Sequence, residues 1–246
     1  MSSTTLCDAF AQFLPPACAG CDGTSAPQRA FCSTCRPAAF RLSPPYCDCC
    51  RVPMERFDEV CDGRSLCSRC RRTPPGFDQV WAPWEYEGAV ADAIRRVKYA
   101  GDFPALRALC RGAQRWFART LERFPANTPL IPIPAHPKEL RKRGFHVPSM
   151  ALRFLGPGED GHPVEHRLRK VHATPRQAGL PISARQRNVE DVFYDRRSTG
   201  SKRAILVDDV LTTGATASAA ARVLMESGFD EISVLVLARA PMVGHY

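Results

Sequence analysis

The run Ala204-Ile-Leu-Val-Asp-Asp-Val-Leu-Thr-Thr-Gly-Ala-Thr216 constrains the fold of this 246-residue chain more than any other segment. Four apolar residues lead into two adjacent carboxylates, Asp208 and Asp209, which a Thr/Gly-rich turn and an alanine-rich stretch follow. A short apolar run bounded by turn residues is typical of a buried strand, and alanine favours helix. We therefore expect a strand, a tight loop and a helix N-terminus, the unit of parallel α/β sheets.

The turn of this run combines the groups that bind a sugar phosphate. A helix start presents unpaired backbone N–H groups and a positive dipole end to an anion, threonine hydroxyls add donors, and glycine allows close approach. The residues of this predicted phosphate loop are Thr212, Thr213, Gly214, Ala215 and Thr216. Asp208 and Asp209 stand beside the loop and can accept hydrogen bonds from two neighbouring sugar hydroxyls. A ligand with a phosphate at one end and two neighbouring hydroxyls, a cis-diol, at the other is a ribose 5-phosphate.

The alternative is a strand-turn-helix in an ordinary doubly wound domain, with an aspartate serving only as a helix cap. We give it less weight because two acids at the end of a strand are costly to keep for packing alone. The run also resembles the signature that binds 5-phosphoribosyl-1-diphosphate (PRPP) in type I phosphoribosyltransferases.

The chain has 12 cysteines, and all but Cys110 precede residue 71. Eight of them form Cys-x-x-Cys pairs, namely Cys18/Cys21, Cys32/Cys35, Cys47/Cys50 and Cys67/Cys70. Two pairs supply the four thiolates of a closed, structural Zn²⁺ site, so four pairs predict two such sites, whose binding energy would help the segment fold. Sequential pairing is simplest, but crossed pairing stays open, and Cys49 or Cys61 could replace a paired cysteine. Redox-active pairs are the rival interpretation, which lacks a surrounding βαβ pattern.

Pro74-Pro75-Gly76 punctuates the end of the cysteine-rich segment. We predict a zinc-ribbon module with two four-cysteine sites at residues 1–76 and a PRPP-binding α/β domain at 77–246. In the second part, hydrophobic patterns predict strands at 80–86, 130–134, 204–208 and 231–238, and helices at 89–98, 106–124, 147–155 and 216–227. Their alternation favours a parallel sheet flanked by helices, with ligands bound at the carboxyl ends of its strands.

Two further segments are rich in cations. Lys138, Arg141, Lys142 and Arg143 follow the predicted strand at 130–134, and a polar stretch at 167–187 contains Arg169 and Lys170 and no acid. We expect the first to hold a diphosphate and the second to be a mobile loop that closes over it. The alternatives are an exposed basic turn for the first segment, and a solvated surface loop or a nucleic-acid patch for the second.

The formal net charge is +9, and two zinc ions with eight thiolates would lower it to +5. A basic surface favours phosphate-bearing partners. No stretch reaches the roughly 18 apolar residues of a membrane span, and the first residues lack the basic start of a secretory signal. We therefore expect a cytoplasmic protein without membrane insertion, in which reduced cysteines bind metal rather than form disulfides.

The combined motifs resemble those of the ComF family, whose members are also called competence protein ComFC or amidophosphoribosyltransferase-like. They are Phe13-Leu-Pro-Pro-Ala-Cys-Ala-Gly-Cys21 and the later cysteine pairs, Val97-Lys-Tyr-Ala-Gly101, Ile131-Pro-Ile-Pro134, Arg143-Gly-Phe145, Thr174-Pro-Arg-Gln177, Arg187-Asn-Val189 and Val207-Asp-Asp-Val-Leu-Thr-Thr-Gly-Ala-Thr216. The family usually has Asn-Gln after Arg-Gly-Phe, where this chain has His146-Val147. The resemblance implies a type I phosphoribosyltransferase fold behind a zinc ribbon, and a link to DNA uptake in natural transformation.

Three functions are consistent with these patterns. The first is a protein that binds PRPP with Mg²⁺ and supports DNA uptake, in contact with DNA-uptake or recombination proteins. The second is an active phosphoribosyltransferase on an unidentified acceptor; purine-specific relatives carry an acid at the position of Thr212, so we rank purines low and assign no catalytic residue. The third is a zinc-dependent module that binds single-stranded DNA, which the adjacent carboxylates disfavour as a sole function.

Overall fold

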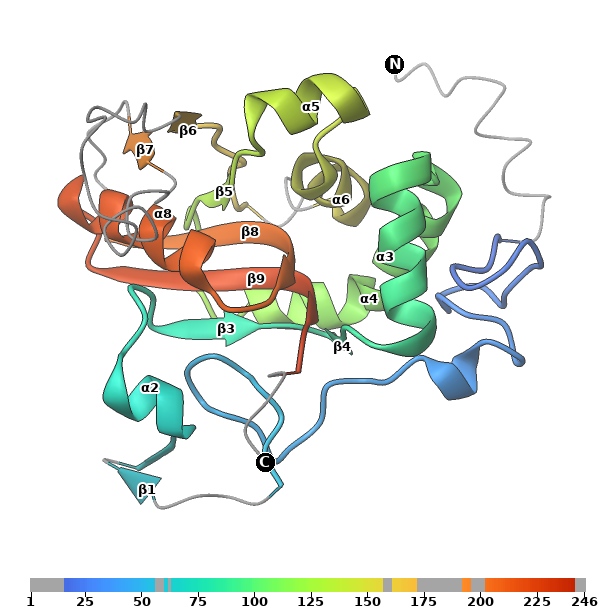
Figure 1. The fold of residues 1–246 in the computed structure, drawn as a ribbon, viewed down its shortest axis with the longest axis horizontal. Coiled ribbons are helices and arrows are strands. Elements are labelled where there is room, and N and C mark those ends of the chain that lie inside the picture. Colours follow the sequence, from blue (N-terminus) through green and yellow to red (C-terminus); the bar gives the residue numbers. More distant parts are fainter. Residues whose placement is uncertain are drawn as a thin grey trace, which may run out of the picture.

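A five-stranded parallel sheet forms the centre of the molecule, with β8 (Arg203–Leu211) and β9 (Glu231–Arg239) as its long middle strands (Figure 1). The computed structural model describes residues 16–55, 60–61, 63–156, 161–171, 192–195 and 202–241, and only the backbone at 60–61, 171 and 192–195. The strand order is β3-β9-β8-β5, where β3 is Gln79–Trp81 and β5 is Leu130–Pro132. A further strand, β4 (Trp84–Glu85), also pairs with β9. The predicted class, a parallel α/β sheet with a cysteine module before it, is confirmed.

Alternate residues of the middle strands serve two separate cores, as the period of two in a strand requires. Ile205 and Val207 of β8 face α3 (Gly88–Ala100), α4 (Phe103–Leu121) and α6 (Val147–Leu155), and Cys18 packs into this core. Ala204 and Leu206 belong to the other core, with α8 (Ala215–Glu226) and the cysteines between Cys47 and Cys70. Each half of the cysteine-rich segment is thus packed against a different face of the sheet.

Caps supplied by the sequence mark some of the helix ends, such as the start of α4 and the end of α3. The Asp102 carboxylate accepts a hydrogen bond from the Ala105 backbone N–H at 3.0 Å, which caps the start of α4. Gly101 ends α3 in the left-handed conformation with φ of 66°. Among the described helices, none combines the length and the hydrophobicity needed to cross a lipid bilayer.

The remaining elements are short. They are η1 (Arg36–Ala38), β1 (Val60–Cys61), β2 (Arg64–Ser65), α2 (Ser68–Arg72), α5 (Pro137–Arg143), β6 (Leu168–Val171) and β7 (Val192–Asp195). Strands β1 and β2 pair antiparallel, as do β6 and β7. In Figure 1 the blue segment that carries the first cysteines lies beside α3, and α2 lies below β3.

Three sequence predictions differ from the structure. The strand expected at 80–86 is broken into β3 and β4, because Pro83 lies between them and has no N–H to donate. The cationic segment at 138–143, where the hydrophobic patterns predict no helix, is the helix α5, which Pro137 starts and Gly144 ends with φ of 77°. Strand β8 does not stop at Asp208 but pairs with β9 as far as Leu211, opposite Arg239.

The strands β5 and β8 are neighbours whose following helices cover opposite faces of the sheet, since α6 belongs to one core and α8 to the other. This is the topological switch point of an open α/β sheet, where a crevice forms at the carboxyl ends of the strands. The fold therefore places a candidate ligand site between the segment after β5 and the second half of β8. The predicted boundary between modules at residues 76 and 77 stays a prediction.

Candidate functional site

A cavity of about 220 Å³ lies at this switch point. We call it the carboxylate cavity, because Asp208 and Asp209 in the second half of β8 form one wall and the segment after β5 forms another. Its charged and polar lining residues are Lys98, Glu139, Arg143, His146, Lys170, Asp208, Asp209 and Thr216. Residues from α3, α5, β6, β8 and α8 thus converge here, although the sequence separates Lys98 from Thr216 by more than a hundred positions.

The carboxylate pair is held by a lysine that sequence reasoning did not assign to the site. Lys98 Nζ lies 2.6 Å from Asp209 Oδ1, and both side chains are largely buried. Asp208 Oδ1 in turn accepts a hydrogen bond of 2.8 Å from the Asp209 backbone N–H. Burial first, and then the nearby Asp209 charge, raise the pKa of Asp208 to about 7. Asp208 therefore gains its negative charge as the pH rises through about 7, in a site that also holds several cations.

His146 fixes the wall of the carboxylate cavity opposite the acids. Its Nε2 lies 2.8 Å from the Ile133 carbonyl oxygen and its Nδ1 lies 2.8 Å from Ser149 Oγ. Burial lowers the pKa of His146, so the ring is neutral at pH 7. A carbonyl only accepts, which means that Nε2 carries the proton and Nδ1 accepts from the Ser149 hydroxyl. The residue that replaces the family's usual asparagine thus ties the end of β5 to the start of α6.

The phosphate loop joins β8 to α8 at the edge of the carboxylate cavity. Gly214 is the residue before α8, with φ of 77°, and a Cβ there would lie 3.4 Å from the Phe77 ring. Thr213 Oγ1 accepts a hydrogen bond of 3.3 Å from the Ala215 backbone N–H. Thr212, Thr213 and Ala215 are exposed, while Thr216 is half-buried and lines the cavity. Of the loop residues, only Thr216 lines the carboxylate cavity, and Thr213, Ala215 and Thr216 line a second cavity behind the loop.

The structure separates the predicted diphosphate residues into two groups. Arg143 and Lys170 line the carboxylate cavity. Lys138, Arg141 and Lys142 are exposed on α5, and Arg169 is exposed on β6, and these four do not line the cavity. The helical form of α5 explains the division, because successive residues of a helix point in different directions. The predicted closing loop falls mainly at 172–191, outside the described residues.

Sequence reasoning missed Lys98, His146 and Glu139 as cavity residues. The sequence did hold a sign that Lys98 belongs to the site. Lys98 is part of the Val97-Lys-Tyr-Ala-Gly101 motif and directly follows Val97, the last apolar residue of the predicted helix face. A polar residue next to a buried helix face has no evident partner in sequence. Only the packing of α3 beside β8 brings Lys98 to Asp209.

The four cysteine pairs combine sequentially into two clusters. Cys18, Cys21, Cys32 and Cys35 form the first, and Cys47, Cys50, Cys67 and Cys70 form the second, with the ligand atoms of each within 4.8 Å of one another. Four thiolates at such distances are the donor set that Zn²⁺ prefers. Cys49 stands apart, with its thiol 3.9 Å from the Phe77 carbonyl. The side chain of Cys61 lies outside the described residues.

The close approach of the thiols in each cluster shifts the pKa values of several of them in opposite directions. Burial raises the pKa of Cys35 to about 12, whereas a hydrogen bond from its backbone lowers the pKa of Cys32 to about 6. In the second cluster, hydrogen bonding to Cys50 lowers the pKa of Cys47, and hydrogen bonding to Cys47 raises that of Cys70. Cys110 is different, because burial alone raises its pKa to about 12, as for a small core residue.

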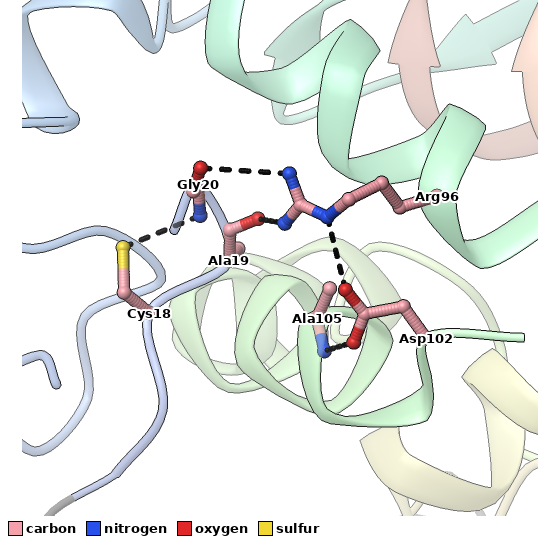
Figure 2. Close-up of polar contacts among 6 residues, drawn as sticks. All are labelled: Cys18, Ala19, Gly20, Arg96, Asp102 and Ala105. Carbon is pink, nitrogen blue, oxygen red and sulfur yellow. Dashed lines mark hydrogen bonds and ion pairs between the residues drawn. The ribbon is translucent and has the colours of Figure 1, made fainter. Parts of the chain in front are cut away.

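An arginine joins the first cluster to the helix that carries Lys98 (Figure 2). Arg96 of α3 donates to the Ala19 carbonyl at 2.5 Å and to the Asp102 carboxylate at 3.0 Å. The Gly20 backbone N–H donates to Cys18 Sγ at 3.2 Å, and a Cβ on Gly20 would lie 2.8 Å from Cys35 Sγ. The segment of the first cluster thus contacts α3 at Arg96, two residues before Lys98.

No protein-family model matches the sequence. Among curated proteins, the chain is 26% identical over 216 residues to "Competence protein F" of Haemophilus influenzae, covering 85% of this chain and 90% of that protein. It is 23% identical to "DNA utilization protein YhgH" of Escherichia coli K12, over 85% of this chain and 90% of the relative. "Competence protein ComFC" of Bacillus subtilis is also 23% identical, over 82% and 80%.

Solved structures give weaker similarity. The allosteric regulatory enzyme of purine biosynthesis matches with 19% identity and a TM-score of 0.33, over 54% of this chain and 26% of the enzyme. Adenine phosphoribosyltransferase from Leishmania tarentolae matches with 17% identity and a TM-score of 0.32, over 57% and 73%.

The sheet, its switch-point cavity and the two four-cysteine clusters define an α/β protein with a candidate ligand site and two candidate metal centres. The sequence relatives, which cover most of the chain, make it a homologue of the ComF-type competence proteins, as its motifs predicted.

Proposed function

We propose that this protein binds PRPP at the switch point of its sheet and acts in the uptake or use of DNA. The observation that carries the proposal is that Asp208, Asp209 and Thr216 of the phosphate loop line one cavity. The two carboxylates would accept hydrogen bonds from the ribose hydroxyls. The 5-phosphate would lie at the N-terminus of α8, with the Thr213 and Thr216 hydroxyls as further donors.

The diphosphate of PRPP needs positive charge, for which the carboxylate cavity offers three side chains. Arg143, Lys170 and Lys98 line it. We infer that Mg²⁺ enters with the diphosphate, since Mg²⁺ favours phosphate and carboxylate oxygens and keeps much of its water. Lys138, Arg141, Lys142 and Arg169 are exposed outside this cavity, so we do not assign them to the same diphosphate.

The proposed role in DNA handling comes from the relatives, whose names are competence protein and DNA utilization protein. We further infer that both cysteine clusters hold Zn²⁺ as structural sites and that the protein works in the cytoplasm, where thiols stay reduced. Proteins of DNA uptake or recombination are its expected partners.

Calorimetry with PRPP and Mg²⁺ tests the proposal. We expect wild type to bind and the Asp208→Asn/Asp209→Asn variant to lose at least about tenfold in affinity, because each amide replaces a charged acceptor. The matched control is Asp92→Asn/Asp230→Asn, which removes the same charge from two exposed aspartates and should bind as wild type does. Absence of binding by folded, zinc-loaded wild type would refute the proposal.

Transfer of the phosphoribosyl group is a second candidate, favoured by the cavity beside the carboxylates. A transferase would release diphosphate from PRPP when its acceptor is added, and release with no candidate base or amine would leave PRPP as a bound ligand only. Thr212 is exposed at the position where purine-specific relatives carry an acid, so we expect purines to be poor acceptors.

Single-stranded DNA binding is a third candidate, favoured by the exposed cations of α5. It predicts an affinity that falls steeply with salt and that the Lys138→Gln/Arg141→Gln/Lys142→Gln variant loses without change in PRPP affinity. Equal DNA binding by this variant and wild type would exclude α5 as the DNA surface.

A further inference from the structure

One buried arginine connects the second cysteine cluster to the phosphate loop. Arg239, the last residue of β9, is 2% exposed and lies opposite Leu211 in the parallel register. Its Nε donates to the Cys50 carbonyl at 2.7 Å, and its Nη1 donates to the Leu211 and Thr212 carbonyls at 3.0 and 2.9 Å. The same side chain therefore holds a cluster cysteine and the first residue of the phosphate loop.

The charge of Arg239 has no carboxylate partner within the described residues. Besides the carbonyls, which include that of Ala240, its Nη2 lies 3.9 Å from Cys50 Sγ. A buried cation is costly unless it is paired. A Zn²⁺ with four thiolates carries a net charge of −2, so the loaded second cluster is the anion that makes this burial favourable.

A cavity of about 290 Å³ separates the cluster from the loop. Cys50 and Cys70 line it on one side, Thr213 and Thr216 line it on the other, and Arg239 forms part of its wall. The Phe77 ring, which packs below Gly214, also lines this cavity. The described side-chain hydrogen bonds that join the metal site to the loop come from one guanidinium, which has a fixed fork geometry.

We propose that Arg239 is a positioning residue that transmits the occupancy of the second metal site to the phosphate loop. With Zn²⁺ bound, Cys50 is fixed and Arg239 holds the Leu211 and Thr212 carbonyls, so that the following N–H groups are aligned for a phosphate. Without the metal, Arg239 loses its counter-charge and the loop loses its anchor. The inference rests on the proposed PRPP function for its binding readout, but not for its structural readout.

Hydrogen exchange of the backbone amides at 212–216 gives the structural readout, on the full chain without any ligand. We expect about tenfold faster exchange in Cys70→Ser, which breaks the second cluster but leaves the atoms that Arg239 contacts. Cys35→Ser, the matched change in the first cluster, should leave these amides unchanged. Equal exchange of the loop amides in wild type and in Cys70→Ser would overturn the proposal.

Arg239→Lys tests whether the branched guanidinium is needed. Lysine keeps the charge but cannot hydrogen-bond to Cys50 and to the Leu211 and Thr212 carbonyls at the same time. We expect normal zinc content, about tenfold faster exchange at 212–216 and about tenfold weaker PRPP binding. The matched control is Arg111→Lys, since Arg111 joins the first cluster's segment to α4 through the Ala17 and Arg29 carbonyls, away from the loop. Unchanged exchange and affinity in a folded Arg239→Lys protein would overturn the proposal.

Binding linkage supplies a test in wild type that does not depend on either variant folding. If zinc in the second cluster strengthens PRPP binding, PRPP must strengthen zinc binding by the same factor. We expect saturating PRPP and Mg²⁺ to slow chelator-driven release of one of two zinc ions about tenfold, an effect that Arg239→Lys abolishes. PRPP binding without any effect on zinc release would overturn the proposal. If wild type binds no PRPP, the proposed function fails, and loop exchange alone decides the role of Arg239.

Discussion

At the scale of residues, the carboxylate cavity is held together without its ligand by one short ion pair. Two adjacent carboxylates, of which Asp209 is buried and Asp208 half-buried, would repel each other, and Lys98 reduces this repulsion by its contact of 2.6 Å with Asp209. The pKa of Asp208 is nevertheless raised to about 7, so burial outweighs the attraction of the nearby cations. Holding the two acids at the proposed sugar site therefore lowers the stability of the folded state.

Replacing Lys98 by methionine should destabilise the protein by about 2 kcal/mol at pH 8, because Asp209 loses its partner while buried. Denaturant unfolding measures the change. The matched control is Arg95→Met, which breaks the exposed pair with Asp92 on the same helix and should cost no more than about 0.5 kcal/mol. A loss of similar size in both variants would contradict a special role for the Lys98 pair.

The raised pKa of Asp208 gives stability a defined pH dependence. The native state holds this proton up to about pH 7, whereas the ordinary value is 3.8, so stability falls as pH rises from about 4 to about 7. Asp208→Asn cannot ionise and should lack this fall, which makes it more stable than wild type above pH 7 by about 4 kcal/mol, with little difference below pH 4. Unfolding curves across this range check it, and parallel pH profiles would contradict the assignment.

At the scale of elements, the sequence located the helices and the main strands but not the direction of their side chains. Hydrophobic periodicity predicted α3, α4, α6, α8, β8 and β9 within a few residues, because each has one apolar face or a buried run. It missed α5, whose seven residues include no buried side chain and therefore no apolar face to detect. For the same reason it grouped Arg143 with Lys142, although only Arg143 lines the cavity.

The cysteine pairs were predictable because a metal site depends on short-range spacing, whereas their sequential pairing needed the fold. Cys49 and Cys50 are adjacent and both buried, so substituting each in turn tests whether Cys50 rather than Cys49 is the zinc ligand. Cys50→Ser should lower the zinc content from two ions per chain to one and should unfold at lower temperature, while Cys49→Ser should keep both ions. Metal analysis with a chromophoric chelator measures this. Loss of zinc from Cys49→Ser alone would show that the ligand set is wrong.

At the scale of the whole molecule, each cysteine cluster supports one wall of the carboxylate cavity from a different face of the sheet. The first holds α3 through Arg96, two residues before Lys98, and the second holds the phosphate loop through Arg239. Sequence could predict a zinc module and a PRPP-type loop separately, because each has a local motif. It could not predict their connection, since Arg239 and Cys50 meet only through the packing of β9.

The most direct measurement is a crystal structure of the zinc-loaded protein with PRPP and Mg²⁺. The ribose hydroxyls should lie within hydrogen-bond distance of the Asp208 and Asp209 carboxylates, and the 5-phosphate should lie on the N–H groups of 213–216. The diphosphate should contact Arg143 or Lys170. PRPP bound away from the carboxylate pair, or a cavity that stays without ligand at saturating PRPP, would contradict the account.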